Sequence, residues 1–516
     1  MIALGRLLLL GVLGILAYAI WLRRKPDPRE PPAVESKIPI VGHLIGMLRH
    51  GVAYSNIQAQ KHPQYPIFSL DMIFGKIYVI TSPALLQAVQ RHAKTLTFDP
   101  LLNGFASRIA GIRSETLKLM DEPRYDGLSL NQVVIHAMQP TLIGESLDRM
   151  NERMARLLRP LIDELAYRET VDLYEWCFST LMAASTDASY GPLNPYKDSK
   201  VQKAFLDFES NLGPLIPNVL PWLTARKAWR GREILVAAIQ NYYEHGGQEN
   251  GSELTYVRWK RTHDSGISTE NIARAEAAMS IGLLSNTIPA SFWILYDLYS
   301  RPALLEEIRE EIKQNALRIT EENVHVIDLS AIRDNCPLLL SAFQEILRTR
   351  TTTAPLRYVT QDVLLADQYL LKKGGIINIP GGSIGRDKAV WGSTADEFNP
   401  RRFLVQSSNE ENKNKKEPRR TGGFMTFGVS PMICPGRHFA SAEILSMVVM
   451  LVLRLDLSPL DGIWKAPPKN PGAVASIMYP VKGCFHVKLA PREEYDGAKW
   501  DFEVKPGKGK YNLMIG

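Results

Sequence analysis

The sequence predicts a mainly α-helical protein with a small β region, in which one large domain follows an N-terminal membrane helix. Helical periodicity covers much of the middle of the chain, strand-like runs are short, and an uncharged apolar run lies near the N-terminus. The chain has 516 residues, 45% of them hydrophobic, and no low-complexity linker after the N-terminus. A chain of this size can bury one large core, so a single domain is the simplest expectation.

Residues 1–22 are predicted to form a transmembrane anchor. The stretch 7–22 carries no charge, Arg6 can reach the membrane interface, and a basic cluster at residues 23–25 follows directly. The positive-inside rule keeps that cluster, and hence the following domain, in the cytosol. A cleaved signal peptide is the alternative, but the basic cluster lies after the apolar run and no small-residue cleavage pattern separates the two.

Residues 23–36 are predicted to form a basic, proline-rich hinge. Prolines at positions 26, 28, 31 and 32 restrict the backbone and favour a stiff, extended connector. The large domain is therefore expected to occupy residues 37–516.

The regular elements of this domain follow in a defined order. Strands are expected to pair around a turn at Gly75 and to return late in the chain, with helices between them. The predicted strands are residues 67–70, 77–80, 363–371 and 376–379, and the predicted helices include residues 145–165, 273–299 and 304–317.

The predicted helix at residues 273–299 contains Asn286, Thr287 and Pro289. Because proline has no N–H group, a carbonyl one turn earlier loses its helical hydrogen bond, and a kink is expected. Asn286 and Thr287 are polar residues that can cap such a kink. Their side chains can also serve a reaction that consumes protons, and both roles are compatible.

Glu345 and Arg348 are three residues apart, so their side chains share one helix face and can form a bidentate ion pair. Taken alone, such a pair is common on solvated helix faces.

Cys434 lies between Gly428 and an apolar, helix-like run at residues 439–455. A thiolate that binds haem iron needs a closely approaching backbone, N–H groups directed at the sulfur and a nearby helix N-terminus, and this segment can provide all three. A buried structural cysteine is the alternative. The other cysteines, at 177, 336 and 484, are widely spaced without a Cys-x-x-Cys pair, so neither a zinc site nor a disulfide framework is indicated.

The run at residues 427–440 resembles the cysteine-ligand loop of the cytochrome P450 family, whose pattern Phe427, Cys434, Gly436 and Ala440 match. The resemblance implies the P450 fold and a haem-thiolate catalytic domain. It also implies a haem (iron protoporphyrin IX) whose iron takes the Cys434 thiolate as axial ligand, a ligand that favours O–O cleavage.

Two positions in this loop depart from the family pattern. Ser430 stands where the family usually has a glycine, and Met432 stands where it usually has an arginine that pairs with a haem propionate. Arg437 is expected to offer replacement charge, and Arg357 matches a position that commonly binds a propionate. His136 is a further candidate, although a lone histidine is more often structural.

Residues 398–403 resemble a second family segment, in which Arg402 joins Glu345 and Arg348 in a buried network. These residues are expected to support the haem-binding core without a chemical role, and removal of one would leave an uncompensated charge.

The stretch at residues 283–289 takes the place of the family's oxygen-activating helix, where an acid usually precedes the threonine. Asn286 stands in place of that acid, and Thr287 is retained. This signature resembles the branch of sterol 7α-hydroxylases and prostacyclin synthase. Because Thr287 accompanies Asn286, as in the hydroxylases, we expect a monooxygenase in which both residues manage protons. The alternative is a haem-thiolate isomerase or dehydratase that needs no external electrons.

The resemblance also implies partners and a location. Electrons would come from an NADPH-dependent flavoprotein reductase, and the protein would be a single-pass protein of the endoplasmic reticulum membrane with a cytosolic catalytic domain. The basic stretch at residues 413–420 can steer an acidic reductase or be a solvated loop. The net charge of +7 does not indicate nucleic acid, because no basic stripe interleaves with aromatic residues.

The substrate is expected to be lipophilic, of sterol, terpenoid or polyketide type, as in biosynthesis of secondary metabolites. Residues 101–112, 205–220 and 278–284 are apolar and are predicted to line its pocket.

Overall fold

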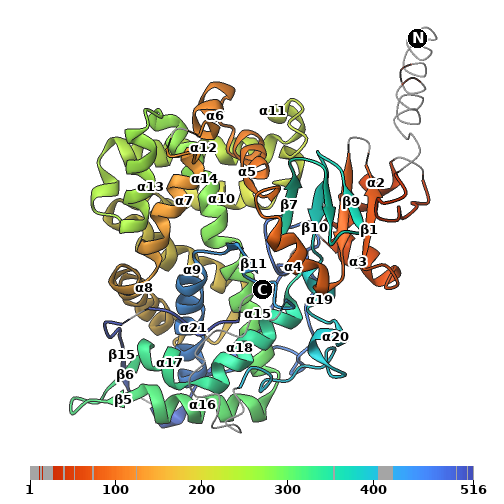
Figure 1. Ribbon diagram of the computed structural model, residues 1–516. Coiled ribbons are helices and arrows are strands. Elements are labelled where there is room, and N and C mark those ends of the chain that lie inside the picture. The colour runs from red at the N-terminus through yellow and green to blue at the C-terminus, as the bar shows by residue number, and fades with distance from the viewer. Residues whose placement is uncertain are drawn as a thin grey trace, which may run out of the picture.

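The computed structural model describes residues 11, 14, 27–38, 41–51, 53–72, 75–123, 125–352, 355–404, 422–495, 497–507 and 509–514. Helices form one large body, and a smaller lobe rich in strands lies against one side of it (Figure 1). The predicted mainly helical fold with a small β region is confirmed. The anchor predicted at residues 1–22, apart from Gly11 and Gly14, and the basic stretch at 413–420 lie outside the described residues.

The α-helices occupy about half of the described chain. They are α2 (Gly42–His50), α3 (Ala53–Lys61), α4 (Pro83–Arg91), α5 (Asp99–Phe105), α6 (Ser114–Asp121), α7 (Leu130–Met138), α8 (Gly144–Leu165), α9 (Leu173–Tyr190), α10 (Ser199–Glu209), α11 (Pro221–Thr224), α12 (Arg226–Glu244), α13 (Glu253–Asp264), α14 (Thr269–Leu284), α15 (Thr287–Tyr299), α16 (Pro302–Ala316), α17 (Leu329–Asn335), α18 (Pro337–Arg350), α19 (Gly381–Ile384), α20 (Lys388–Trp391) and α21 (Arg437–Arg454).

The strands form several small sheets. The strand order in the β-rich lobe is β1 (Ile67–Asp71), β2 (Lys76–Ile80), β10 (Ile376–Asn378), β7 (Leu356–Val359) and β3 (Leu96–Thr97). The other sheets join β13 (Leu455–Pro459), β14 (His486–Pro491) and β4 (Thr170–Asp172); β15 (Lys499–Glu503), β6 (Val324–Asp328) and β5 (Leu317–Ile319); β8 (Val363–Leu365) and β9 (Tyr369–Leu371); and β11 (Gly428–Val429) and β12 (Met432–Ile433).

Most predicted elements are present where the sequence indicated them. The helices expected at 145–165 and 304–317 are α8 and α16, and the strands expected around Gly75 are the antiparallel pair β1 and β2. The strand region at 363–371 is a hairpin, because Ala366 and Asp367 take positive φ angles of 51° and 57° and turn the chain between β8 and β9.

The long helix predicted at residues 273–299 is interrupted at Ser285 and Asn286, between α14 and α15. Pro289 cannot donate to the carbonyl of Ser285, and that carbonyl accepts a hydrogen bond from the Ser476 hydroxyl at 2.9 Å instead. The side-chain oxygen of Asn286 accepts the N–H of Ile477 at 2.8 Å. The interruption is therefore held open by a segment distant in the sequence.

The core of the helical body lies where α15 packs against α21. Every residue of α15 is buried, and α21 is buried over most of its length. Within the described part of the chain, Thr269–Tyr299 is the one helical stretch long and apolar enough to cross a membrane, and 78% of its most apolar window is buried inside the molecule. It is the central helix of the fold.

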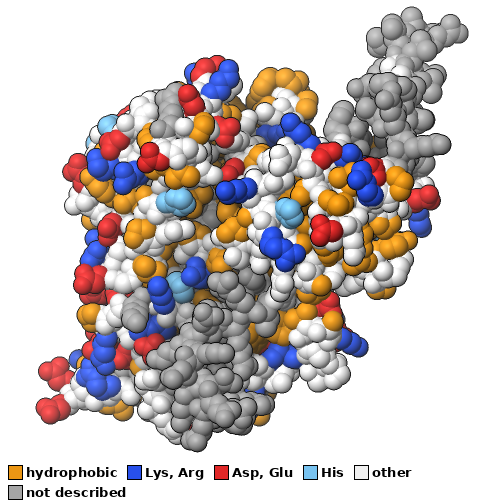
Figure 2. Space-filling model, in the orientation of Figure 1, with side chains coloured by type: hydrophobic (Ala, Val, Ile, Leu, Met, Phe, Trp, Pro, Cys, Tyr) orange, Lys and Arg blue, Asp and Glu red, His pale blue; other side chains and the backbone are white. Residues whose placement is uncertain are grey.

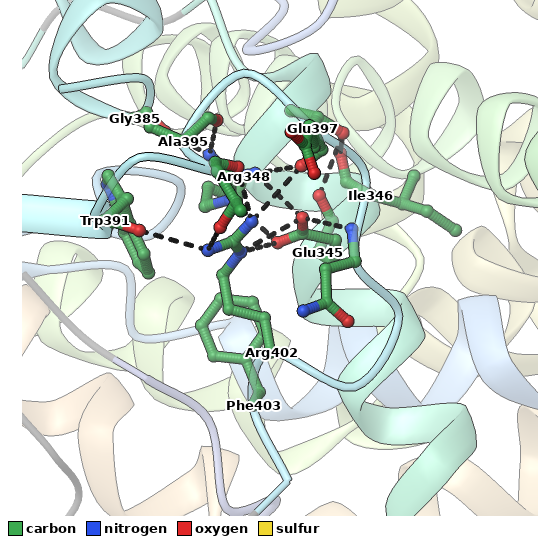
Figure 3. Close-up of polar contacts among 12 residues, drawn as sticks. Glu345, Ile346, Arg348, Gly385, Trp391, Ala395, Glu397, Arg402 and Phe403 are labelled. Atoms are coloured by element: carbon green, nitrogen blue, oxygen red, sulfur yellow. Dashed lines mark hydrogen bonds and ion pairs between the residues drawn. The ribbon is translucent and has the colours of Figure 1, made fainter. Parts of the chain in front are cut away.

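A buried charge network links α18 to the segment that follows α19 (Figure 3). The guanidinium of Arg348 donates to both carboxylate oxygens of Glu345 at 2.7 and 2.8 Å, and Nε of Arg402 lies 3.1 and 3.2 Å from the same oxygens. The side chains of Glu345 and Arg348 are 0% exposed. Arg348 also donates to the carbonyls of Gly385 and Ala395 at 2.5 and 2.7 Å. The predicted triad is present, and it fixes a long loop to the core.

Glu345→Gln is expected to destabilise the fold by about 3–5 kcal/mol, because it leaves Arg348 and Arg402 buried without their carboxylate. Urea unfolding followed by circular dichroism would measure this loss. Glu152→Gln is the matched control, since Glu152 and Arg156 form an exposed ion pair on α8 and its loss should change stability much less. Equal effects of the two substitutions would contradict the structural role of the triad.

Candidate active site

The loop that carries Cys434 is shaped by the short hairpin of β11 and β12 and ends at the start of α21. Gly428 has a φ of 91°, and a Cβ atom there would lie 2.4 Å from the carbonyl oxygen of Met432, so only glycine fits. The N–H of Cys434 donates to the carbonyl of Phe427 at 2.8 Å. These constraints hold the thiol in one place next to the helix N-terminus.

Burial raises the pKa of the Cys434 thiol above its ordinary value. The N–H of Gly436, the charge of Arg437 and the N–H of Arg437 oppose this rise, because each favours the anionic sulfur. Gly436 is the N-cap of α21, so the helix dipole acts in the same direction. Cys434 is exposed and is one of the residues that line a cavity.

That cavity has a volume of about 460 Å³ and lies between the Cys434 loop and the interrupted central helix. Its wall is mostly apolar. Six of the predicted site residues contribute to it: Cys434, Phe427, Gly436, Arg357, Asn286 and Thr287. The structure thus brings together, around one cavity, residues from α15, β7 and the cysteine loop that are far apart in the sequence.

Arg357 is a buried cation without an acidic partner among the described residues. It is 4% exposed, and its guanidinium donates to the carbonyls of Leu356 and Val429, each at 2.8 Å. Burial lowers the pKa of Arg357 to about 10. A buried guanidinium next to a cavity suits an anionic group of a ligand, as the sequence suggested for a haem propionate.

Two other candidates for that role lie elsewhere. Arg437 donates to the carbonyl of Cys434 at 3.0 Å and is not among the residues that line the cavity, and its role as replacement for the arginine missing at Met432 stays a prediction. His136 is exposed on α7 and is likewise absent from the wall. The sequence alone does not indicate whether a side chain after Cys434 can take the place of one before it.

Thr287 and Asn286 have different surroundings although they are adjacent. The Thr287 hydroxyl lies 3.4 Å from the carbonyls of Leu283 and Leu284, long contacts that leave the hydroxyl free to reorient. The carbonyl oxygen of the Asn286 side chain is held by Ile477, so its NH₂ group is the part that remains for the cavity. An amide can orient water but has no acidic proton to give.

The cavity wall differs in part from the prediction. Residues Met279, Gly282 and Leu283 come from the predicted segment 278–284, whereas neither 101–112 nor 205–220 contributes. Two polar features were missed. One is the buried pair of Arg258 and Glu276, and the other is the carboxyl of Glu443 on α21. These residues lie in helical stretches whose sequence has no feature that marks a site. Their place at the cavity follows from how the helices pack.

The remaining cysteines do not reach the cavity. Cys177 and Cys336 are buried elsewhere, and burial raises the pKa of both thiols. Cys484 is exposed beside Asp172 and His486, with potential ligand atoms within 4.8 Å of one another. Asp172 is already engaged as the N-cap of α9. Among the cysteines, Cys434 is therefore the one placed to bind a cofactor in the cavity.

The residues present fit a haem held by Cys434. The apolar wall can cover a flat macrocycle, the N–H groups of Gly436 and Arg437 point at the sulfur, and Arg357 can take up a propionate. The fit rests on this combination of a thiol and an unpaired cation around one cavity.

Comparison with known proteins shows the family of this chain. The sequence model described as "Cytochrome P450" matches residues 31–485. The chain is 41% identical over 509 residues to "Cytochrome P450 monooxygenase nodJ" from Hypoxylon pulicicidum, covering 97% of this chain and 98% of that protein. It is 23% identical over 489 residues to a "5-beta-cholestane-3-alpha,7-alpha-diol 12-alpha-hydroxylase" from Sus scrofa, covering 89% and 94%.

The fold also matches a solved structure, "Retinoic acid bound cyanobacterial CYP120A1". The TM-score is 0.65 at 16% sequence identity, and the match covers 90% of this chain and 99% of that chain. At this identity the likeness concerns the fold.

Cys434→Ser is expected to remove the thiolate-type Soret band from the difference spectrum of the reduced, carbon-monoxide-bound protein, because serine cannot supply a thiolate. Cys484→Ser is the matched control, since Cys484 is exposed and outside the cavity. Retention of the band in Cys434→Ser, or its loss in Cys484→Ser, would contradict the assignment of the ligand.

Proposed function

The chain is an enzyme of the cytochrome P450 family, which binds haem through a cysteine thiolate, and on this premise we propose that it is a membrane-anchored monooxygenase. It oxidises a lipophilic substrate with O₂ and with electrons that a flavoprotein reductase takes from NADPH. Haem bound through a thiolate supplies the activation of oxygen. The observation that carries the proposal is that Cys434 and Thr287 belong to the wall of the same apolar cavity.

Each site residue has a role in this proposal. Cys434 binds the iron, and Phe427 and Gly436 shape the loop around the sulfur. Arg357 binds a propionate, while the charge of Arg437 stabilises the thiolate. Thr287 and Asn286 manage protons: Thr287 passes them into the cavity, and the NH₂ group of Asn286 orients water while its oxygen bonds to the N–H of Ile477.

The proposed substrate class is a sterol, terpenoid or polyketide. The apolar wall supports a lipophilic ligand of considerable size. The names of two relatives support an oxygenase rather than an electron-independent enzyme, since one is a monooxygenase and the other hydroxylates a cholestane diol. An isomerase or dehydratase remains the alternative because Asn286 replaces the acid that oxygen-dependent members of the family place before the threonine.

We place the protein at the endoplasmic reticulum membrane, with residues 1–22 as anchor, 23–36 as hinge and 37–516 as cytosolic catalytic domain. Exposed apolar side chains support contact with a membrane: Ile216, Val219, Leu220, Trp222 and Leu223 in and before α11, and Ile38, Ile45 and Leu48 in and before α2. Both helices lie toward the top of Figure 1, and Figure 2 shows apolar side chains gathered at the top edge over α11.

Reductase dependence tests the proposed reaction. The purified protein is expected to show a thiolate-type Soret band and to convert a member of a sterol, terpenoid and polyketide panel only when NADPH and reductase are both present. Conversion without them, with the band present, would favour the isomerase. Absence of the band would remove the haem-thiolate function.

Membrane attachment is expected to have two components. Deletion of residues 1–36 should weaken binding to phosphatidylcholine vesicles, and Trp222→Asp with Leu223→Asp in the shortened protein should abolish the remainder, because both side chains are more than half exposed. Flotation on a density gradient measures this. Tyr167→Asp is the control, since Tyr167 is 90% exposed on a different segment. Unchanged flotation of the double substitution would contradict contact through α11.

A further inference from the structure

Three side chains with metal-binding atoms lie together at the point where β4 meets β14. They are Asp172, Cys484 and His486, and their potential ligand atoms lie within 4.8 Å of one another. Cys484 and His486 are exposed, and Asp172 is partly buried. None of the three lines the cavity at Cys434, so the cluster is a separate feature of the molecule.

The pairing of β4 with β14 places these residues side by side. His486 and Asp172 are directly opposite each other in the antiparallel register, and Cys484 lies two residues before His486. The N–H of Phe485 donates to Oδ1 of Asp172 at 3.2 Å. The carbonyl of Phe485 accepts the N–H of Leu173 at 2.9 Å. The backbone that carries the three potential ligands is therefore held by hydrogen bonds on both sides.

The opposite face of this segment is occupied by core side chains. The centre of the Phe485 ring lies 5.5 Å from that of Phe292 and 5.8 Å from that of Tyr296, and Leu173 is 0% exposed. Neighbouring side chains of an extended chain point to opposite faces. Because Phe485 and Leu173 face the core, the three potential ligands next to them in the chain lie on the outer face, where an ion can reach them.

The charges around the cluster suit a cation. Asp172 is the N-cap of α9 and accepts the N–H groups of Tyr174 and Glu175 through Oδ1, so Oδ2 remains available. The hydrogen bond and the charge of Asp172, together with the charge of Glu175, raise the pKa of the Cys484 thiol. Within the described chain, no lysine or arginine is among the groups that shift this pKa. A bound metal ion would add positive charge to these acidic surroundings and would favour the thiolate.

The combination of a thiol, an imidazole and a carboxylate indicates which metal fits. Zn²⁺ accepts all three, with sulfur at about 2.3 Å and nitrogen or oxygen at about 2.0–2.2 Å, whereas Ca²⁺ and Mg²⁺ prefer oxygen ligands. Two ligands of a tetrahedral zinc ion are about 3.5 Å apart at these bond lengths. The present separations of up to 4.8 Å are larger by about 1 Å, a difference that rotation of exposed side chains can remove.

We propose that Asp172, Cys484 and His486 form a zinc site on the surface of this protein. Oδ2 of Asp172, Sγ of Cys484 and one ring nitrogen of His486 bind the ion, and water takes the fourth position. The proton of the Cys484 thiol passes to solvent as the ion binds, and no electrons move. The site does not depend on the proposed monooxygenase function, because it shares no residue with the site of that reaction.

The first test measures Zn²⁺ binding to the full-length haem protein, without an affinity tag, by equilibrium dialysis and elemental analysis. Wild type is expected to hold one Zn²⁺ ion that Cys484→Ser and His486→Ala do not hold. Loss of a direct ligand should weaken binding by more than the roughly 10–100-fold that loss of an outer-shell partner costs. His263→Ala is the matched control, because His263 is an exposed histidine beside Asp264 without a cysteine. It should bind zinc as wild type does.

X-ray absorption at the zinc edge identifies the ligands, and haem iron does not contribute at that edge. The wild-type spectrum is expected to show sulfur at about 2.3 Å together with lighter ligands at about 2.0–2.2 Å. The sulfur contribution should be absent from Cys484→Ser. Zinc bound without a sulfur ligand, or bound equally by wild type and Cys484→Ser, would show an adventitious ion only and would overturn the proposal.

Asp172→Asn separates metal binding from folding. Asparagine is also a good N-cap, so α9 should keep its first turn while the site loses a negative ligand. Zinc affinity should fall in this variant with little change in the circular dichroism spectrum. An affinity equal to that of wild type would contradict the role of Asp172 in the site.

The ligands come from β4 and from the chain at the start of β14, so a bound ion joins the two strands. Saturating Zn²⁺ should therefore raise the apparent melting temperature of wild type and of His263→Ala, and leave that of Cys484→Ser unchanged. An equal shift in all three proteins would contradict binding at this site. A wild type without a thiolate-type Soret band would instead count against the proposed function, and the zinc result would stand apart from it.

Discussion

The packing of α15 against α21 is the contact on which the rest of the structure depends. Both helices are buried over most of their length, so their relative position cannot change without disturbing the core. One of them begins at Thr287, and the other begins directly after the cysteine loop. Their packing therefore sets where the hydroxyl, the thiol and the carboxyl of Glu443 lie relative to one cavity.

The buried charged residues of this protein are of two kinds. Some stabilise the fold, and others face the cavity of the candidate active site. Glu345 has two arginines bonded to its carboxylate, and further guanidinium N–H groups donate to backbone carbonyls, so each charged group of this network has partners. Arg357 and Glu443 lack an opposite charge among the described residues. Burial lowers the pKa of Arg357 and raises that of Glu443, and both shifts favour the neutral form of the group. Burying an unpaired charged group costs free energy. A bound ligand or a bound proton that neutralises the group offsets this cost, and such groups are typical of functional sites.

Local sequence patterns were sufficient for much of the fold and part of the site. The spacing of Glu345 and Arg348, the glycine at 428 before the cysteine, and the proline at 289 each act on their immediate neighbours, and each has the predicted consequence. For Arg437 the structure adds a contact that spacing does not indicate, since its side chain donates to the carbonyl of Cys434. Two of the three predicted pocket segments, 101–112 and 205–220, do not line this cavity, since apolar periodicity does not say which helix face meets a cavity.

The sequence by itself determined the mainly helical fold, the cysteine loop, the charge triad and the interruption of the central helix, because each depends on residue type and short-range spacing. Only the tertiary structure decided which polar groups share a cavity. Ser185, Thr287 and Glu443 come from three helices widely separated in the chain, and Ile477 reaches Asn286 across 191 residues. Such contacts arise from the way the helices pack against one another. Local patterns in the amino-acid sequence do not indicate which distant residues will meet.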